Sequence, residues 1–151
     1  MDNFGLYVIL TNPKLPHSDI ARACVDEEIR YLQIREKNWD DISLLRLAEE
    51  LNHITENSNT NLVINDRPDI AVLANANALH LGQGDLPVTA VRRFISPKMK
   101  VGLSTHSLEQ AKTALAHKPD YIGFGPVYST PTKAIPDPVV GLKHIRTVVE
   151  M

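Results

Sequence analysis

Polar and charged clusters follow short apolar, β-branched runs at intervals along this 151-residue chain. The clusters are Gln33 to Lys37, Asn65 to Arg67, His80 to Asp85, Ser104 to Ser107 and Thr130 to Lys133, with a weaker one at residues 11–13. If the apolar runs are strands of a parallel sheet, their carboxyl ends lie at one face, where distant residues converge on one ligand. The spacing therefore predicts one site assembled from several strand ends.

Two carboxylates in these clusters, Asp66 and Asp85, follow successive predicted strands. Mg²⁺ is typically held by one or two carboxylates, while water and phosphate oxygens complete its shell. The alternative is that each aspartate caps the helix after it, Asp66 before Pro68 and Asp85 before Pro87. Spacing alone leaves both interpretations open.

Three cations at strand ends, Arg35, Lys37 and Lys133, favour the metal interpretation. Cations beside metal-binding carboxylates form a site for a polyanion such as diphosphate. The segment Thr130-Pro131-Thr132-Lys133 follows a glycine-containing run and offers two hydroxyls and an ammonium to phosphate oxygens. It lacks the Gly-x-x-x-x-Gly-Lys spacing of a P-loop. A threonine-rich turn stiffened by proline is the alternative.

Gln33 lies within a predicted strand, so its amide either faces the interior or hydrogen-bonds a ligand. Ser104 stands at a strand end, where it either bonds a heterocycle or starts a helix. His80 and His106 have the chemistry for acid–base work, but packing or hydrogen bonding is the commoner role of such a histidine. The other histidines are interpreted as surface residues: His17, His53, His117 and His144.

The apolar runs are short and rich in Val, Ile and Leu, as is typical of strands covered on both faces. The expected strands are 6–10, 31–34, 62–64, 78–81, 100–103 and 121–124. Helical periodicity follows at 42–54, 108–116, about 87–94 and 142–149. Asp40 or Asp41 is a plausible cap of the first of these helices, and Ser107 with Gln110 forms a capping-box pattern before the second.

Strand and helix thus alternate six times within one expected domain, residues 1–151. Right-handed connections leave two architectures, a (β/α) barrel or an open doubly wound sheet. Six units favour the open sheet by count alone, because a complete barrel needs about 250 residues, or roughly 200 when compact.

A net charge of −2 gives no bulk electrostatic reason to bind nucleic acid. The single cysteine, Cys24, lies among small apolar residues and is interpreted as buried rather than nucleophilic. The N-terminus has no basic region, and the run Leu6 to Leu10 is too short for a signal or a membrane span. A soluble, cytoplasmic protein is expected.

Taken together, the motifs resemble those of the thiamine phosphate synthase family, also called thiamin-phosphate pyrophosphorylase, from Leu6 to Val149. The matching motifs are Gln-x-Arg-Glu-Lys, Asn-Asp-Arg, His-Leu-Gly-Gln-x-Asp and Gly-Pro-Val-x-x-Thr-x-Thr-Lys. The resemblance implies a TIM-type (β/α)₈ barrel, of which about six of eight units are present. It also implies a transferase of thiamine biosynthesis that condenses a hydroxymethylpyrimidine diphosphate with a hydroxyethylthiazole phosphate.

The resemblance also implies roles for individual residues. Asp66 and Asp85 hold Mg²⁺, while Arg35, Lys37 and Lys133 are catalytic through their charge on the departing diphosphate. The residues expected to bind substrate are Gln33, Ile34, Arg35, Glu36, Lys37, Asn65, Ser104, Thr130, Pro131, Thr132 and Lys133. Of these, Thr130 to Thr132 receive the thiazole phosphate.

The chain also departs from the family pattern. Gly84 stands where many members have Glu, and complete members continue past the equivalent of Met151 through a seventh strand with an Ala-x-Gly-Gly-Ile motif and an eighth strand. We therefore expect a C-terminally truncated chain with open sheet edges, which favour a homo-oligomer. Two alternatives stay open: a thiazole tautomerase relative using His106, and an inactive fragment that binds substrate or a partner.

Overall fold

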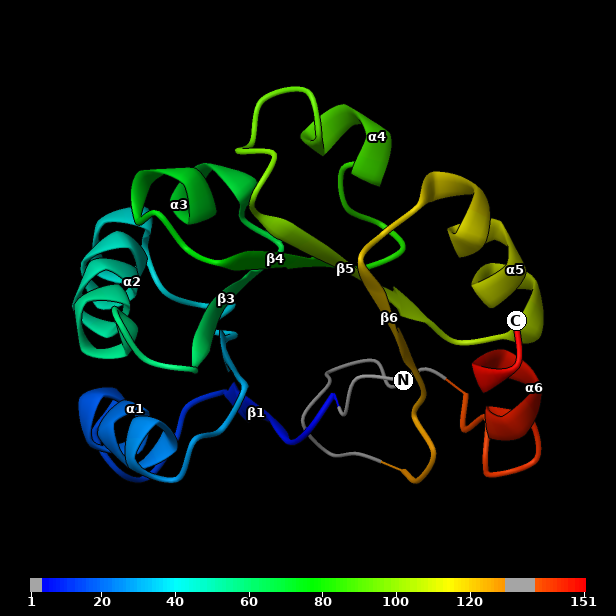
Figure 1. Ribbon diagram of the computed structural model, residues 1–151, viewed down its shortest axis with the longest axis horizontal. Coiled ribbons are helices and arrows are strands. Elements are labelled where there is room, and N and C mark those ends of the chain that lie inside the picture. Colours follow the sequence, from blue (N-terminus) through cyan, green and yellow to red (C-terminus); the bar gives the residue numbers. More distant parts are fainter. Residues whose placement is uncertain (1–3, 130–137) are drawn as a thin grey trace. The chain divides into compact units, whose positions relative to one another are not determined.

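The computed structural model describes residues 4–129 and 138–151, and in this part of the chain strands and helices alternate throughout (Figure 1). The strands are β1 (Tyr7–Leu10), β2 (Tyr31–Ile34), β3 (Asn61–Asn65), β4 (Ala78–Leu81), β5 (Lys100–Thr105) and β6 (Tyr121–Phe124). The helices are α1 (His17–Asp26), α2 (Asp41–Thr55), α3 (Pro68–Leu73), α4 (Val88–Val91), α5 (Leu108–His117) and α6 (Ile145–Val149). Each strand lies within two residues of its expected bounds.

The strands form a sheet in the order β1-β2-β3-β4-β5-β6. Strand β2 is parallel to β1 and to β3, with Ile34 opposite both Leu10 and Ile64. Strand β6 is parallel to β5, with Ser104 opposite Gly123. A doubly wound sheet reverses its strand order at a switch point, whereas a barrel-type fold adds its strands in sequence. The sequential order therefore excludes the open doubly wound sheet that the number of units favoured.

Two helix starts have the caps that the sequence predicted. The Asp40 carboxylate accepts the Ser43 backbone N–H at 2.9 Å, and the Ser107 hydroxyl accepts that of Gln110 at 3.1 Å. Proline 87 is the N-cap of α4 rather than part of its first turn, and α4 ends at Val91, short of the expected Phe94. These ends determine where each strand-to-helix loop begins and stops.

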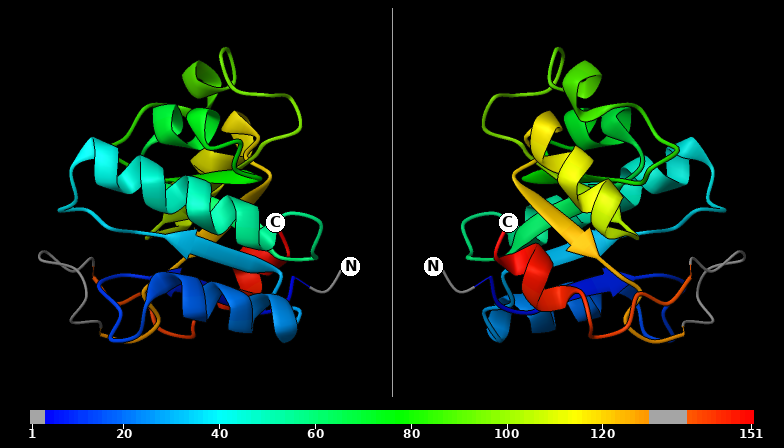
Figure 2. Two further views of the ribbon diagram at one scale, coloured as in Figure 1. Left: turned by 90° about the vertical axis from the view of Figure 1, so that its left-hand side faces the viewer. Right: turned by 90° about the vertical axis from the view of Figure 1, so that its right-hand side faces the viewer.

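The chain divides into two compact units, Met1–Leu79 with Ile95–Met99 and His80–Phe94 with Lys100–Met151. In the first unit every residue of β2 is buried, as expected of a strand covered on both faces. One face of its sheet packs Tyr31 with Val63, Ala78 and Tyr7. Helices α1 and α2 lie side by side, and α2 also contacts α3 (Figure 2, left). The expectation of a single domain stays a prediction.

In the second unit α5 packs on β5 and β6 (Figure 2, right). Gly102 of β5 is needed there, because a Cβ atom would lie 2.2 Å from the Tyr121 ring and 2.6 Å from His80 Nδ1. No helix in the described residues is long and apolar enough to cross a membrane.

Candidate functional site

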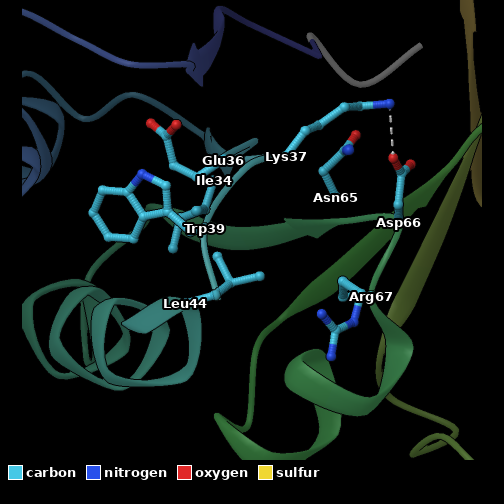
Figure 3. Close-up of a pocket in the computed structure, with 8 residues that line it drawn as sticks. All are labelled: Ile34, Glu36, Lys37, Trp39, Leu44, Asn65, Asp66 and Arg67. Atoms are coloured by element: carbon cyan, nitrogen blue, oxygen red, sulfur yellow. Dashed lines mark ion pairs between the residues drawn. The ribbon is translucent and has the colours of Figure 1, made fainter. Parts of the chain in front are cut away.

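A cavity of about 180 Å³ in the first unit collects residues from the ends of β2 and β3. Its lining consists of Ile34, Glu36, Lys37, Trp39, Leu44, Asn65, Asp66 and Arg67 (Figure 3). Ile34 and Leu44 are buried and apolar, whereas Lys37 and Asp66 carry opposite charges. Five residues that the sequence predicted for the site, Ile34, Glu36, Lys37, Asn65 and Asp66, are thus brought together.

Lys37 and Asp66 form the charged pair of this cavity. Lys37 Nζ lies 3.1 Å from Asp66 Oδ2, and the lysine side chain is 54% exposed (Figure 3). The Asp66 side chain is 25% exposed, so one carboxylate faces both a cation and solvent. Such a pair can bind a metal–diphosphate complex. The ammonium would bind diphosphate oxygens, and the carboxylate would bind the metal ion.

Asp66 occupies an unusual backbone conformation, with φ at 60°. The Arg67 N–H donates to the Asn65 carbonyl at 2.8 Å, which closes a three-residue turn around Asp66. A γ-turn with positive φ at a non-glycine residue is rare and strained, and such strain concentrates at functional sites. The turn also explains why Asp66 does not cap α3, whose N-cap is Arg67 with no side-chain cap bond.

Arg67 holds this turn from outside the charged pair, and its side chain points away from Lys37 (Figure 3). Its guanidinium donates to both oxygens of Asp69, at 2.9 and 2.6 Å, and to Asp41 Oδ1 at 2.6 Å. The hydrogen bonds that Arg67 donates to Asp69 and Asp41 raise the pKa of Arg67, and the bond from Arg67 lowers the pKa of Asp69. The guanidinium is therefore matched by two carboxylates of the chain and is not the cation offered to a ligand.

Glu36 is buried in spite of its charge, with a side chain that is 5% exposed. Its Oε1 accepts the Asn12 backbone N–H at 2.7 Å and lies 2.8 Å from His17 Nε2. The His17 ring in turn meets the Trp39 ring edge-on, with centroids 5.3 Å apart. The interpretation of His17 as a surface residue is wrong: its side chain is 14% exposed, because α1 turns it toward Glu36.

Gln33 and Arg35 flank this group along the chain. Gln33 is 2% exposed and donates from Nε2 to the Tyr7 hydroxyl at 2.7 Å, so its amide faces the interior. Arg35 is half-buried, and its backbone N–H continues the β1–β2 pairing by donating to the Leu10 carbonyl at 2.8 Å.

The second unit holds Asp85, the other expected metal ligand. Its Oδ2 accepts the Gly82 backbone N–H at 2.6 Å, so the carboxylate closes its own loop. The N-cap of α4 is Pro87, without a side-chain cap bond, so Asp85 does not cap that helix. Asp85 also lines a cavity of about 230 Å³ with Gln83 and residues of α5.

Ser104 lies within β5 and does not start a helix. Its Oγ is 2.9 Å from His80 Nε2, and His80 Nδ1 is 3.3 Å from the Tyr121 hydroxyl. Gln83 Nε2 donates to the Ser104 carbonyl at 2.6 Å. The serine, the histidine and the loop before Asp85 are therefore tied together by hydrogen bonds.

His106 and Cys24 have surroundings typical of hydrogen-bonding and packing residues. His106 Nδ1 lies 2.6 Å from the Gly125 carbonyl, so this nitrogen carries a proton and donates it. Cys24 is buried, and burial raises the pKa of its thiol, as expected of a packing residue.

Four expected ligands, Thr130, Pro131, Thr132 and Lys133, lie outside the described residues. Among the residues that are described, no group of three or more His, Cys, Asp or Glu side chains could hold a metal ion. Asp66 belongs to the first unit and Asp85 to the second. A carboxylate with the Asn65 amide beside it in the cavity nevertheless offers the oxygen ligands that Mg²⁺ prefers.

A parallel sheet whose strands are added in sequence, with acidic and basic side chains gathered at its strand ends, defines a TIM-type α/β protein. The family model described as thiamine monophosphate synthase matches residues 6–151. The chain belongs to this family, which confirms the resemblance drawn from its motifs.

Individual proteins similar to this chain carry the same family name. The chain is 45% identical over 115 residues to a thiamine-phosphate synthase of Lawsonia intracellularis, covering 76% of this chain and 53% of that protein. It is 35% identical to one of Methanospirillum hungatei, covering 97% and 72%. It spans 41% of a third, from Gloeobacter violaceus, at 36% identity over 93% of this chain. The chain thus spans about half the length of the first of these relatives.

A solved structure has the same fold. The thiamine phosphate pyrophosphorylase from Pyrococcus furiosus superposes with a TM-score of 0.84 at 29% identity, covering 97% of this chain and 70% of that one. The fold class, a TIM-type α/β architecture, is therefore confirmed.

Proposed function

We propose that this chain carries out thiamine phosphate synthesis. The reaction joins 4-amino-2-methyl-5-(diphosphooxymethyl)pyrimidine to 4-methyl-5-(2-phosphooxyethyl)thiazole, giving thiamine phosphate and diphosphate. The observation that carries the proposal is the pairing of Lys37 with Asp66 at 3.1 Å in a cavity shared with Asn65. Membership of the thiamine monophosphate synthase family supports it.

In the proposed reaction the bond between the pyrimidine methylene carbon and the diphosphate oxygen breaks, and its electron pair leaves with the diphosphate. The thiazole nitrogen then donates its lone pair to the pyrimidine-methyl cation. Because the attacking nitrogen carries no proton, no general base is needed. The catalytic demand is therefore to stabilise negative charge on the leaving group, which positioned cations do well in a partly enclosed site.

Different side chains are proposed to bind different parts of the two substrates. Lys37 and Arg35 at the end of β2 bind the diphosphate oxygens, and Lys133 joins them. Asn65 and Ser104 are proposed to hold the pyrimidine, while Gln33 supports it from within β2. Thr130, Pro131 and Thr132 are proposed to bind the thiazole phosphate.

Mg²⁺ is the proposed metal, held by Asp66 and Asp85. When bound, it supplies a positive charge that neutralises diphosphate oxygens. Asp66 is suited to this task because its carboxylate is one-quarter exposed and lies beside a lysine that would bind the same diphosphate. The oxygen chemistry of Asp66 and Asn65 fits the ion.

An assay of thiamine phosphate formation from the two substrates tests this function. The full chain should form product with Mg²⁺, and Lys37→Met should lower the rate by at least about a hundredfold, as is typical when a positioned charge is removed from the transition state. Arg22→Met is the control, since Arg22 is an exposed cation of α1 that pairs with the exposed Asp19 at 3.5 Å. Absence of product at high protein concentration, with both substrates and Mg²⁺ in excess, would refute the proposal.

The partners proposed for this protein are the two small molecules, with no nucleic acid and no membrane. A cytoplasmic location and a homo-oligomer formed through sheet edges stay predictions.

A further inference from the structure

Glu36 is a charged side chain placed where a ligand has little access to it. In the proposed function it lies between two cations of the diphosphate site, yet its side chain is 5% exposed. Its Oε1 is engaged twice within the protein, by the Asn12 N–H at 2.7 Å and by His17 at 2.8 Å. Burying a carboxylate is costly unless such partners compensate the lost hydration.

The two partners of Glu36 come from a different part of the chain. Asn12 follows β1 and has φ at 44°, a left-handed conformation that asparagine adopts more readily than most non-glycine residues. His17 is the first residue of α1. Glu36 therefore joins the loop after β1 and the start of α1 to the loop after β2, in addition to the backbone bond from Arg35 to Leu10.

Lys37 is the next residue, and its side chain leaves the backbone in another direction, toward Asp66 (Figure 3). Rotation of the backbone at Glu36 would swing Lys37 away from Asp66, since neighbouring residues share a peptide plane. The carboxylate bonds of Glu36 oppose that rotation. The backbone at Lys37 is thereby fixed, which matters because the long lysine side chain loses much conformational entropy when it is ordered.

We propose that Glu36 and His17 act together as positioning residues, which hold the loop after β2 so that Lys37 meets Asp66 and the diphosphate. Glu36 in this account does not bind substrate itself, and His17 becomes part of the functional machinery. The inference rests on the proposed function, because it assumes that the Lys37 cation binds diphosphate.

Binding of inorganic diphosphate in the presence of Mg²⁺, measured by calorimetry on the full chain, tests the proposal. Glu36→Gln and His17→Ala should each weaken binding by about tenfold, as is typical for groups that orient a ligand residue. His17→Gln keeps a donor for the carboxylate and should restore most of the affinity. Matched controls are His53→Ala and Glu56→Gln, which remove an exposed His–Glu pair of 3.8 Å in and beside α2.

Coupling to Lys37 separates positioning from a general structural role. In a Lys37→Met background, Glu36→Gln should have no further effect on the affinity, because its influence passes through the lysine. Tryptophan fluorescence supplies a second measurement, since Trp39 is the single tryptophan and contacts His17. Its emission in Glu36→Gln should shift before any ligand is added, if the His17 ring is released.

The outcomes are distinct. Equal binding by wild type, Glu36→Gln and His17→Ala would overturn the positioning role and leave the proposed function standing. So would an undiminished effect of Glu36→Gln in the Lys37→Met background. No binding of magnesium diphosphate by the wild-type chain would overturn both. Should Glu36→Gln lower the melting temperature strongly, His17→Ala and its rescue by His17→Gln still decide the question.

Discussion

Asp66 and Asp85 each follow a strand, and the family resemblance implies that both bind the same ion, yet their surroundings differ. Asp66 lies in a strained turn, and its carboxylate faces Lys37 from a neighbouring strand end. Asp85 has no positive φ, and its carboxylate accepts the Gly82 N–H of its own loop. One aspartate therefore faces a side chain from another strand end, whereas the other stabilises the backbone of its own loop.

The backbone strain at Asp66 is compensated by contacts of the residue that follows it. Arg67 follows Asp66 in the turn and donates hydrogen bonds to Asp41 and Asp69. These hydrogen bonds stabilise the turn and so compensate the free-energy cost of the positive φ. A conformation of this kind costs about 1–3 kcal/mol and persists only where surrounding contacts over-determine it. The Asp85 loop has no such strain, and the Asp85 carboxylate stabilises it by accepting the Gly82 N–H.

Of the changes that compare the two aspartates, Asp66→Asn should have the largest effect. Loss of the carboxylate charge should weaken Mg²⁺-dependent diphosphate binding by about ten- to a hundredfold. The free energy of unfolding should change by less than about 1 kcal/mol, because the pair with Lys37 is partly exposed. Calorimetry and urea denaturation measure the two effects. Unchanged binding would remove Asp66 from the metal site.

At Asp85 we expect a change in stability as well as in binding. Asp85→Ala leaves the Gly82 N–H without its acceptor and should lower the free energy of unfolding by about 1–2 kcal/mol. Asp85→Asn keeps an acceptor oxygen and should stay within about 0.5 kcal/mol of wild type. Both variants should weaken Mg²⁺-dependent binding. If the two variants were equally stable by urea denaturation, the loop-closing role would be wrong.

Glycine substitutions should act in opposite directions at the two positions. At Asp66, with φ at 60°, the glycine variant should be about 1 kcal/mol more stable than the alanine variant, since glycine tolerates this conformation. At Asp85, the glycine variant should be less stable than alanine by about 0.5–1 kcal/mol. Paired denaturation curves test this, and the same order at both positions would contradict the assigned strain.

The smallest expected effect is a pH dependence of the free energy of unfolding. It arises from the pair of Arg67 with Asp69, which stabilises the Asp66 turn. The bond from Arg67 lowers the pKa of Asp69, so the pair stabilises the fold above about pH 4, the ordinary Asp range, and loses this contribution as pH falls through the lower folded value. Because the Asp69 side chain is 56% exposed, we expect only about 0.2–1 kcal/mol. Urea denaturation of wild type and Asp69→Asn between neutral and acidic pH measures it. A difference that grows toward acid would show that the sign is wrong.

Much of the fold could be predicted because parallel strands buried on both faces have an unmistakable composition. Strands β2, β4 and β6 begin and end at the expected residues. Local capping patterns were equally informative, since Asp40 and Ser107 bond N–H groups only three residues away. The choice between barrel-type and doubly wound order could not be made from the count of units, because strand order depends on pairing between distant segments.

The site was predictable in its residues but only partly in its contacts. The motifs placed Lys37, Asn65 and Asp66 at one location, and the structure gathers them in one cavity. The partners of Glu36 and Arg67 were missed, because His17 and Asp41 lie 19 and 26 residues away with no pattern connecting them. Positive φ at Asp66 likewise has no signature in an Asn-Asp-Arg sequence.

The sequence by itself determined which chemistry is present: carboxylates, cations and hydroxyls at the ends of strands, in the order of a known family. Such information is local, since residue type and spacing decide strand, helix and cap. The tertiary structure decided what each group does, because a carboxylate's role depends on what faces it. Contacts between distant segments turned Glu36 inward to His17, Asp66 outward to Lys37, and Asp85 back onto its own loop.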